Sequence, residues 1–186
     1  QGGNVAWGTW PEEFNDPDNI AVRDFARAAK TRIAFHAWLQ WVADTQLADA
    51  QARARAAGMR IGFYLDLAVG ISPDGSRCWL DGPAIARHAR VGCPPDPFSA
   101  LGQDWGLVPF SPVGLAEERL EPFRSVLRDN MRHAGALRID HAMGMQRLYW
   151  IPEGNTAVDG AYLAYPFREL LEAVAEESWI SQTIVI

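Results

Sequence analysis

The sequence is poor in the features that mark several common classes of protein. It has only two cysteines, Cys78 and Cys93, whose spacing fits neither a disulfide framework nor a metal-ligand motif. It has no apolar run of about eighteen residues or more, the length that a membrane span requires. The first residues, Gln1–Trp10, lack the charged and then apolar pattern of a signal peptide. We therefore expect a cytoplasmic protein that does not engage a membrane.

Positive charge is also scarce. Lysine and arginine together number 17 against 23 aspartates and glutamates, which gives a formal net charge of −6. The basic residues are scattered rather than clustered, so the sequence offers no patch that could bind nucleic acid. Tryptophan, by contrast, is plentiful, with eight residues. Flat aromatic faces suit sugar-binding clefts, although packing in a hydrophobic core accounts for most tryptophans equally well.

The hydrophobic pattern alternates between helical and extended segments, and 186 residues are enough for the core of one domain. We predict helices over Thr31–Met59, Pro112–Ala134 and Phe167–Glu177, a shorter helix capped by Asp18 or Asn19, and strands over Ile61–Asp66, Leu137–Asp140 and Thr183–Ile186. Such alternation is typical of a parallel sheet, so the predicted fold class is α/β, with about three parallel strands and flanking helices. Three strands cannot close a barrel, so the sheet edges would stay open for self-association.

Two long segments show no clear periodicity. Gly70–Pro112 is predicted to be a loop, apart from a short helix over Gly82–Arg90, and Pro152–Pro166 is predicted to be a second loop. Loops of this length in a compact domain are uncommon and are usually functional.

The proline-rich part of the first loop carries four candidate binding residues. Prolines stiffen the chain, so Phe98 and Trp105 can be presented at a low cost in conformational entropy. Asp96 and Gln103 would add polar contacts. A surface loop that is pinned by its own aromatic side chains explains the same composition equally well.

The strongest candidates for chemistry lie on the predicted strand Leu137–Asp140. Its alternation places Arg138 and Asp140 on one face, about 6–7 Å apart along the strand. A neighbouring guanidinium lowers the pKa of a carboxyl group, and a carboxylate nucleophile must be ionised near neutral pH. Asp66 ends the preceding strand, and parallel α/β barrels keep their chemistry at the carboxyl ends of strands. The alternatives are a structural ion pair for Arg138 and Asp140, and a helix cap or turn for Asp66.

A metal site is a further alternative for the same residues. Asp66, Asp140 and His141 could supply three ligands from adjacent strand ends. The positive charge of Arg138 disfavours a divalent cation at this position. We therefore expect no metal and no other cofactor.

Several ordered motifs resemble the bacterial 4-α-glucanotransferases of the amylomaltase type, glycoside hydrolase family 77. The motifs are Phe35–Trp41 (FHAWLQW), Gly62–Gly70 (GFYLDLAVG), Pro94–Phe98 (PPDPF), Gly102–Gly106 (GQDWG), Leu137–His141 (LRIDH) and Leu148–Trp150 (LYW). They cover nearly the whole chain, from about Trp10 to Ile186. Several blocks in one order make the resemblance specific, unlike a single Arg-x-Asp pair.

The resemblance implies an α-amylase-like (β/α)8 TIM barrel and retaining transfer of α-1,4-glucan segments between malto-oligosaccharides. Asp140 matches the catalytic nucleophile of that family, and Arg138 matches the arginine beside it. Asp66, His141 and a lid over Pro94–Gly106 would line the substrate-binding cleft. Within the lid, the residues expected to contact substrate are Asp96, Phe98, Gln103 and Trp105.

One part of the family pattern is missing. The acid/base glutamate belongs to a Gly-Glu-Asp-Leu-Gly segment after the fifth strand, and the sequence reaches Ile186 without it. Retaining chemistry needs two carboxyl groups about 5–5.5 Å apart. Glu176 and Glu177 lie on the helix before the last strand and are discounted as the second group. We therefore expect residues 1–186 to be an incomplete catalytic barrel domain that is inactive by itself.

Two other functions stay open. The first is an α-glucan hydrolase with the same barrel, in which water rather than a sugar hydroxyl takes the glycosyl group. The second is a non-catalytic fragment that binds glucan or associates with itself through its open sheet edges.

Overall fold

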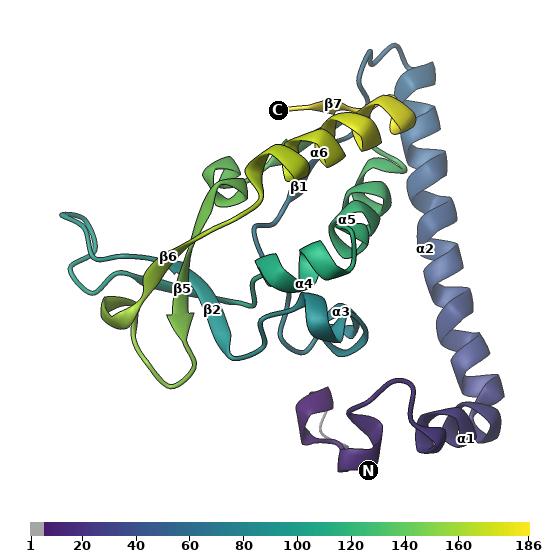
Figure 1. The fold of residues 1–186 in the computed structure, drawn as a ribbon. Coiled ribbons are helices and arrows are strands. Elements are labelled where there is room, and N and C mark those ends of the chain that lie inside the picture. The colour runs from purple at the N-terminus through teal and green to yellow at the C-terminus, as the bar shows by residue number, and fades with distance from the viewer. Residues whose placement is uncertain (1–5) are drawn as a thin grey trace. The chain divides into compact units, whose positions relative to one another are not determined.

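The computed structural model describes residues 6–186, which belong to two compact units, Gln1–Gly62 and Phe63–Ile186. Residues 1–5, part of the segment considered above for a signal peptide, lie outside the described residues. The first unit is helical, and the second contains the strands found in the described part of the chain (Figure 1).

The first unit is built on two consecutive helices. These are α1 (Ile20–Ala28) and α2 (Lys30–Ala56), preceded by the short 3-10 helices η1 (Trp7–Thr9) and η2 (Glu12–Phe14). Of the two predicted caps, Asn19 is the one used, because its side-chain oxygen accepts a hydrogen bond from the Ala21 N–H at 3.0 Å. The predicted long helix is confirmed, although it ends at Ala56 rather than Met59.

The second unit contains a parallel three-stranded sheet. Its strands, in spatial order, are β1 (Tyr64–Leu67), β4 (Ala136–Ile139) and β7 (Ile184–Val185). Both pairs of neighbours are parallel, which confirms the predicted α/β class and the three predicted strands. The register pairs Asp66 with Arg138 and therefore sets the geometry of the site.

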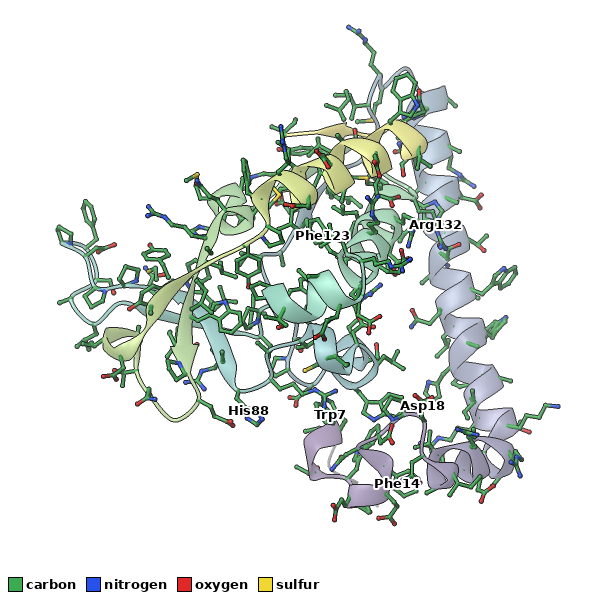
Figure 2. All side chains as sticks on the ribbon, viewed as in Figure 1. Trp7, Phe14, Asp18, His88, Phe123 and Arg132 are labelled. Carbon is green, nitrogen blue, oxygen red and sulfur yellow. The ribbon has the colours of Figure 1, made fainter. Side chains whose placement is uncertain are left out.

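Helices α5 (Glu121–Met131) and α6 (Phe167–Ser181) enclose the main hydrophobic core together with this sheet. Its buried members are Leu67, Leu115, Phe123, Leu127, Met131, Leu137, Leu170, Ala173 and Val174. Phe123, labelled in Figure 2, projects from α5 into this interior. Burial of apolar surface stabilises a fold by about 25 cal/mol per Å², so this core holds β1 and β4 and hence the residues at their ends.

The single helix predicted over Pro112–Ala134 is wrong, because the structure has two helices there. They are α4 (Pro112–Glu117) and α5, separated by Glu118, Arg119 and Leu120, and the last two have φ angles of 51° and 62°. Pro122 explains the break, since proline lacks an N–H and its ring clashes with the carbonyl oxygen four residues earlier in a continuous helix. In the first turn of α5 the same proline is well tolerated.

A second sheet, antiparallel throughout, was not predicted. Its strands in order are β3 (Gln103–Leu107), β2 (Ala89–Cys93), β5 (Arg147–Pro152) and β6 (Ala161–Ala164). The remaining helical pieces are α3 (Ser76–Leu80), η3 (Gly82–Ala84), η4 (Ala142–Met145) and η5 (Ala157–Asp159). Figure 1 shows β2, β5 and β6 to one side of α4 and α5.

The predictions of long loops are therefore wrong. Gly70–Pro112 contains β2, β3 and α3, and Pro152–Pro166 contains β6. The helix predicted over Gly82–Arg90 is limited to η3, and its last two residues open β2. β2 pairs with the distant β5, β2 and β3 each contain a glycine, and β6 has only four residues, so local periodicity does not reveal these strands.

Candidate functional site

Three charged side chains meet at the carboxyl edge of the parallel sheet. Arg138 donates from one terminal nitrogen to Asp66 Oδ1 at 3.1 Å and from the other to Asp140 Oδ1 at 2.7 Å. All three side chains are about half exposed. The pKa of Arg138 is raised above its ordinary value, first by the hydrogen bond to Asp66 and then by the charges of Asp140 and Asp66. The guanidinium therefore stays charged and holds both carboxylates.

The end of β4 positions Asp140. The Asp140 N–H donates to the Leu67 carbonyl oxygen at 3.2 Å, which continues the pairing of β1 and β4 to this residue. His141 follows with φ 51° and ψ 49°, a left-handed conformation that turns the chain. Its carbonyl oxygen accepts a 2.7 Å hydrogen bond from the Gly144 N–H. The chain thus turns away directly after Asp140 and leaves the carboxylate at the strand end.

A cavity of about 440 Å³ lies against this carboxyl edge. Asp66, Asp140 and His141 contribute to its polar wall, and the rest is largely apolar, with Phe110 and Tyr165 among its aromatic members. Cavities of about 300–1,000 Å³ with mostly apolar walls and a few convergent polar groups are typical of small-molecule sites. The strands thus present their charged ends to a space large enough for an organic ligand.

Trp105 and Gln103 reach the same region from the antiparallel sheet. The Trp105 and His141 rings meet edge to face, with their centroids 5.3 Å apart and their planes at 81°. The Gln103 side-chain oxygen accepts a hydrogen bond from Trp105 Nε1 at 3.0 Å. The predicted site residues that the structure brings together are therefore Asp66, Gln103, Trp105, Arg138, Asp140 and His141.

The other two predicted residues, Asp96 and Phe98, lie in the loop between β2 and β3 and do not line the cavity. Asp96 Oδ1 accepts hydrogen bonds from the N–H groups of Phe98 and Ser99, both at 2.7 Å, so this carboxylate shapes a turn. Phe98 is 99% exposed. Contact of either residue with a substrate stays a prediction.

Tyr165 borders the cavity and was not predicted. Its phenol donates to the Phe110 carbonyl oxygen at 2.6 Å and accepts a bond from Trp150 Nε1 at 3.1 Å. Burial raises the pKa of Tyr165, and the hydrogen bond with Trp150 offsets this only in part. The neutral phenol thus joins the antiparallel sheet to the segment before α4. No local pattern could single it out, because its partners are distant in the sequence.

No metal-binding cluster is found in residues 6–186, where no three histidine, cysteine, aspartate or glutamate side chains are arranged to hold an ion. Arg138 binds both Asp66 and Asp140, and its positive charge disfavours a divalent cation between them. Among the described helices, none has the length and apolar character needed to cross a membrane.

The fold and the site define an α/β protein of the barrel type, with charged groups at the carboxyl ends of its parallel strands. The family model described as 4-alpha-glucanotransferase (Glyco_hydro_77) matches residues 1–186. This chain therefore belongs to the 4-alpha-glucanotransferase family, and the resemblance read from its motifs is confirmed.

Two curated relatives agree with this assignment. The 4-alpha-glucanotransferase of Mycobacterium bovis is 42% identical over 180 residues, which are 97% of this chain and 25% of the relative. The 4-alpha-glucanotransferase of Haemophilus influenzae is 39% identical over 182 residues, which are 98% of this chain and 26% of the relative. The chain thus spans about a quarter of the length of these relatives.

Solved structures support the barrel-type fold. An amylomaltase from Corynebacterium glutamicum matches with a TM-score of 0.79 and 41% identity, over 82% of this chain and 22% of that chain. An amylomaltase from Streptococcus agalactiae in complex with acarbose matches with a TM-score of 0.83, over 97% of this chain and 37% of that chain. At 21% identity the second likeness supports the fold alone. The predicted fold class is confirmed.

Proposed function

We propose that this chain carries the nucleophile of a 4-alpha-glucanotransferase that transfers α-1,4-glucan segments with retention of configuration. The observation that carries the proposal is Asp140, held by Arg138 at 2.7 Å beside a cavity at the carboxyl edge of the sheet. Family membership agrees with a malto-oligosaccharide as substrate.

In the proposed reaction a carboxylate oxygen of Asp140 attacks the anomeric carbon of a malto-oligosaccharide. The bond from that carbon to the glycosidic oxygen breaks, and an acid donates a proton to the leaving oxygen. The 4-hydroxyl of a second sugar then attacks the glycosyl-enzyme and gives its proton to the conjugate base of that acid. Asp140 leaves as a carboxylate, and two inversions at the carbon give retention.

The surrounding residues would orient these steps. Arg138 holds Asp140 in one direction, and its contact with Asp66 ties that direction to the neighbouring strand. His141, with Trp105 and Gln103 behind it, would form a wall against the sugar. Asp96 and Phe98 would contact the sugar from the loop between β2 and β3.

The proton donor is a separate proposal. Asp66 already pairs with Arg138 at 3.1 Å, so it is a poor candidate for a group that must carry a proton. We propose that the donor is supplied from outside residues 6–186 and that residues 1–186 form an incomplete catalytic barrel domain. The 186-residue chain alone should then form no product from maltotriose.

The test uses the polypeptide produced from the complete coding sequence, incubated with maltotriose. We expect glucose together with malto-oligosaccharides longer than maltotriose. Asp140→Asn should lower the rate by about 10⁴-fold or more. Asp24→Asn, which changes an exposed carboxylate on α1, should leave the rate unchanged. Longer products from Asp140→Asn at the wild-type rate would overturn the proposal.

The same assay separates the alternatives. A hydrolase would release glucose and maltose without longer products. A glucan-binding module would retain maltotriose on the protein without turnover.

Self-association and a cytoplasmic location are also proposed. β7 is an edge strand of the described sheet, and Ile184 and Ile186 are 53% and 67% exposed. Light scattering should give the mass of a dimer for the 186-residue chain, and Ile184→Lys should give a monomer. Cys78 and Cys93 are both free thiols, which agrees with a reducing compartment.

A further inference from the structure

The hairpin of β2 and β3 contains an irregularity beside the site. Its pairing steps from Gly92–Asp104 to Val91–Leu107, which leaves Trp105 and Gly106 without partners on β2. Gly106 has a φ of 68°, which residues with a side chain rarely adopt. The irregularity is a bulge, named here the Trp105 bulge, and it takes Trp105 out of the regular ladder.

An ion pair, the Arg90–Asp104 clamp, closes this bulge. Arg90 Nε donates to Asp104 Oδ2 at 2.6 Å, and Asp104 Oδ1 accepts a hydrogen bond from the Gly106 N–H at 2.9 Å. A terminal nitrogen of Arg90 also donates to the Asn155 carbonyl oxygen at 3.2 Å, in the turn after β5. The clamp therefore fixes the residues on both sides of Trp105 and anchors them to the neighbouring strands.

The clamp is a charged pair. Burial by itself raises the pKa of the Asp104 carboxyl group, but the hydrogen bonds from Arg90 and the Gly106 N–H, with the charge of Arg90, lower the pKa below its ordinary value. The Arg90 and Asp104 side chains are only 30% and 36% exposed. Hydrogen bonds between charged groups are shorter and stronger than those between neutral groups.

Trp105 carries this constraint toward the nucleophile. Its backbone is fixed by the clamp, and its indole nitrogen is fixed by Gln103. Its ring meets the ring of His141, the left-handed residue directly after Asp140. A continuous path of contacts thus runs from the clamp to the peptide next to Asp140.

We propose that Arg90 and Asp104 are positioning residues that hold Trp105 against His141 and thereby shape the sugar-binding wall next to Asp140. Arg90, Asp104 and Trp105 do not line the cavity, whereas His141 does, so the clamp acts on the cavity wall through the contact of Trp105 with His141. The geometric part of the proposal needs only the clamp, whereas its effect on sugar binding rests on the proposed function. Loss of the clamp weakens binding more than turnover, because Trp105 supports the ring of His141 in the cavity wall and does not contact the carboxylate of Asp140.

The first measurement follows Trp105 directly by ¹⁹F NMR. The polypeptide from the complete coding sequence is labelled with 5-fluorotryptophan, and Trp105→Phe assigns the resonance. We expect Arg90→Gln and Asp104→Asn each to move the Trp105 resonance to the position of a solvent-exposed indole, and Arg90→Lys to restore it in part. Arg168→Gln, which removes an exposed arginine of α6, is the matched control and should leave the resonance unchanged.

The second measurement is the disproportionation of maltotriose. Both clamp variants should raise KM by about three- to tenfold, the loss expected for one aromatic contact, with kcat changed by about twofold or less. The resonances of the other tryptophans report whether each variant is folded. If Arg90→Gln or Asp104→Asn does not fold, Arg90→Lys is measured in its place.

Each outcome decides one part of the proposal. A folded Arg90→Gln protein with an unshifted Trp105 resonance overturns the clamp. A shifted resonance with an unchanged KM overturns its effect on sugar binding. If the wild-type polypeptide shows no turnover, the proposed function fails, and the Trp105 resonance still decides whether the clamp positions Trp105.

Discussion

Asp66 on β1 lies directly opposite Arg138 on β4 in the register of the parallel sheet, and a 3.1 Å hydrogen bond joins their side chains. The two residues are 72 positions apart in the sequence, so only the pairing of the strands can bring them together. A slip of one residue in this pairing would turn Arg138 and Asp140 together to the other face of the sheet, away from Asp66. The core that fixes this register therefore also fixes the site.

Replacement of Arg138 by lysine should reduce activity strongly. The planar guanidinium contacts two carboxylates at once, whereas the lysine ammonium is a point charge on a flexible stem. We expect Arg138→Lys to lower the rate of maltotriose disproportionation by about 10²-fold, because the nucleophile loses its fixed direction. Arg168→Lys on α6 is the control, and a loss of less than about threefold in Arg138→Lys would contradict the expectation.

Addition of a methyl group at Gly92 should destabilise the hairpin. A Cβ at this position would collide with the Gln103 carbonyl oxygen and would lie 2.7 Å from Ile151 Cδ1. We expect Gly92→Ala to lower the free energy of unfolding by about 1–3 kcal/mol, measured by urea denaturation. Gly8→Ala, where a Cβ meets nothing within 4 Å, should be nearly neutral. Equal urea denaturation midpoints for the two variants would show that the hairpin accommodates the added methyl group without loss of stability.

Tyr165 should contribute to stability in a pH-dependent way. Tyr165→Phe leaves Trp150 Nε1 and the Phe110 carbonyl oxygen without this partner, so we expect a loss of about 1–3 kcal/mol near neutral pH. Because burial raises the pKa of Tyr165, its stabilising effect is fully present below pH 10.0, the ordinary value, and is lost as the pH rises further.

The measurement for Tyr165 compares urea denaturation at about pH 8 and about pH 11. The difference in free energy of unfolding between wild type and Tyr165→Phe should be smaller at the higher pH. Tyr162→Phe, which changes a half-exposed tyrosine of β6, provides the control. A difference that widens with pH would contradict the assignment of a neutral, buried phenol.

Two adjacent glutamates of α6 should differ sharply in their effect on stability. Glu177 is 2% exposed, and its Oε1 lies 3.5 Å from nitrogens of both Arg124 and Arg128 on α5. Glu176 has a side chain that is 60% exposed and pairs with Arg124 at 2.7 Å. We expect Glu177→Ala to cost about 2–4 kcal/mol, mainly through the cavity it leaves, because Arg124 and Arg128 keep Glu176 and Glu121 as partners.

The matched variant Glu176→Ala should cost about 0–1 kcal/mol, the usual value of an exposed ion pair. Urea denaturation of the 186-residue chain measures both. Equal losses would mean that the buried carboxylate does not stabilise the packing of α5 on α6.

The parallel half of the fold could be predicted because its signals are local. Leu137 and Ile139 alternate with Arg138 and Asp140, and the 2.7 Å contact between the latter two confirms that they share a face. The long apolar stripes of the helices and the capping side chain of Asn19 are equally local.

The antiparallel half could not be predicted for the opposite reason. β2 pairs with β5 across more than fifty residues, and the β2–β3 ladder is broken at the Trp105 bulge. The bulge interrupts the period-2 alternation on which a strand prediction depends, and pairing with a distant strand leaves no local signal. The helix break before α5 was likewise missed, because the apolar positions on both sides of Pro122 fit one continuous stripe.

The candidate site shows the same division. The carboxylates at the strand ends followed from strand geometry, whereas the placement of Trp105 against His141 depends on the missed sheet. Contact of Asp96 with substrate stays a prediction, and the structure shows that its carboxylate also forms a turn. A polar side chain in a proline-rich loop can accept hydrogen bonds from backbone N–H groups nearby, and sequence alone does not distinguish that role from ligand binding.

The bulge in β3 has a length of two residues, Trp105 and Gly106, and that number is even. Side chains alternate between the faces of a strand, so an even insertion leaves every residue on either side of it facing as before. Deletion of both residues would give a regular β ladder in which the remaining side chains of β3 keep their faces. Trp105 is thus carried by an insertion whose removal would leave the two faces of the hairpin as they are.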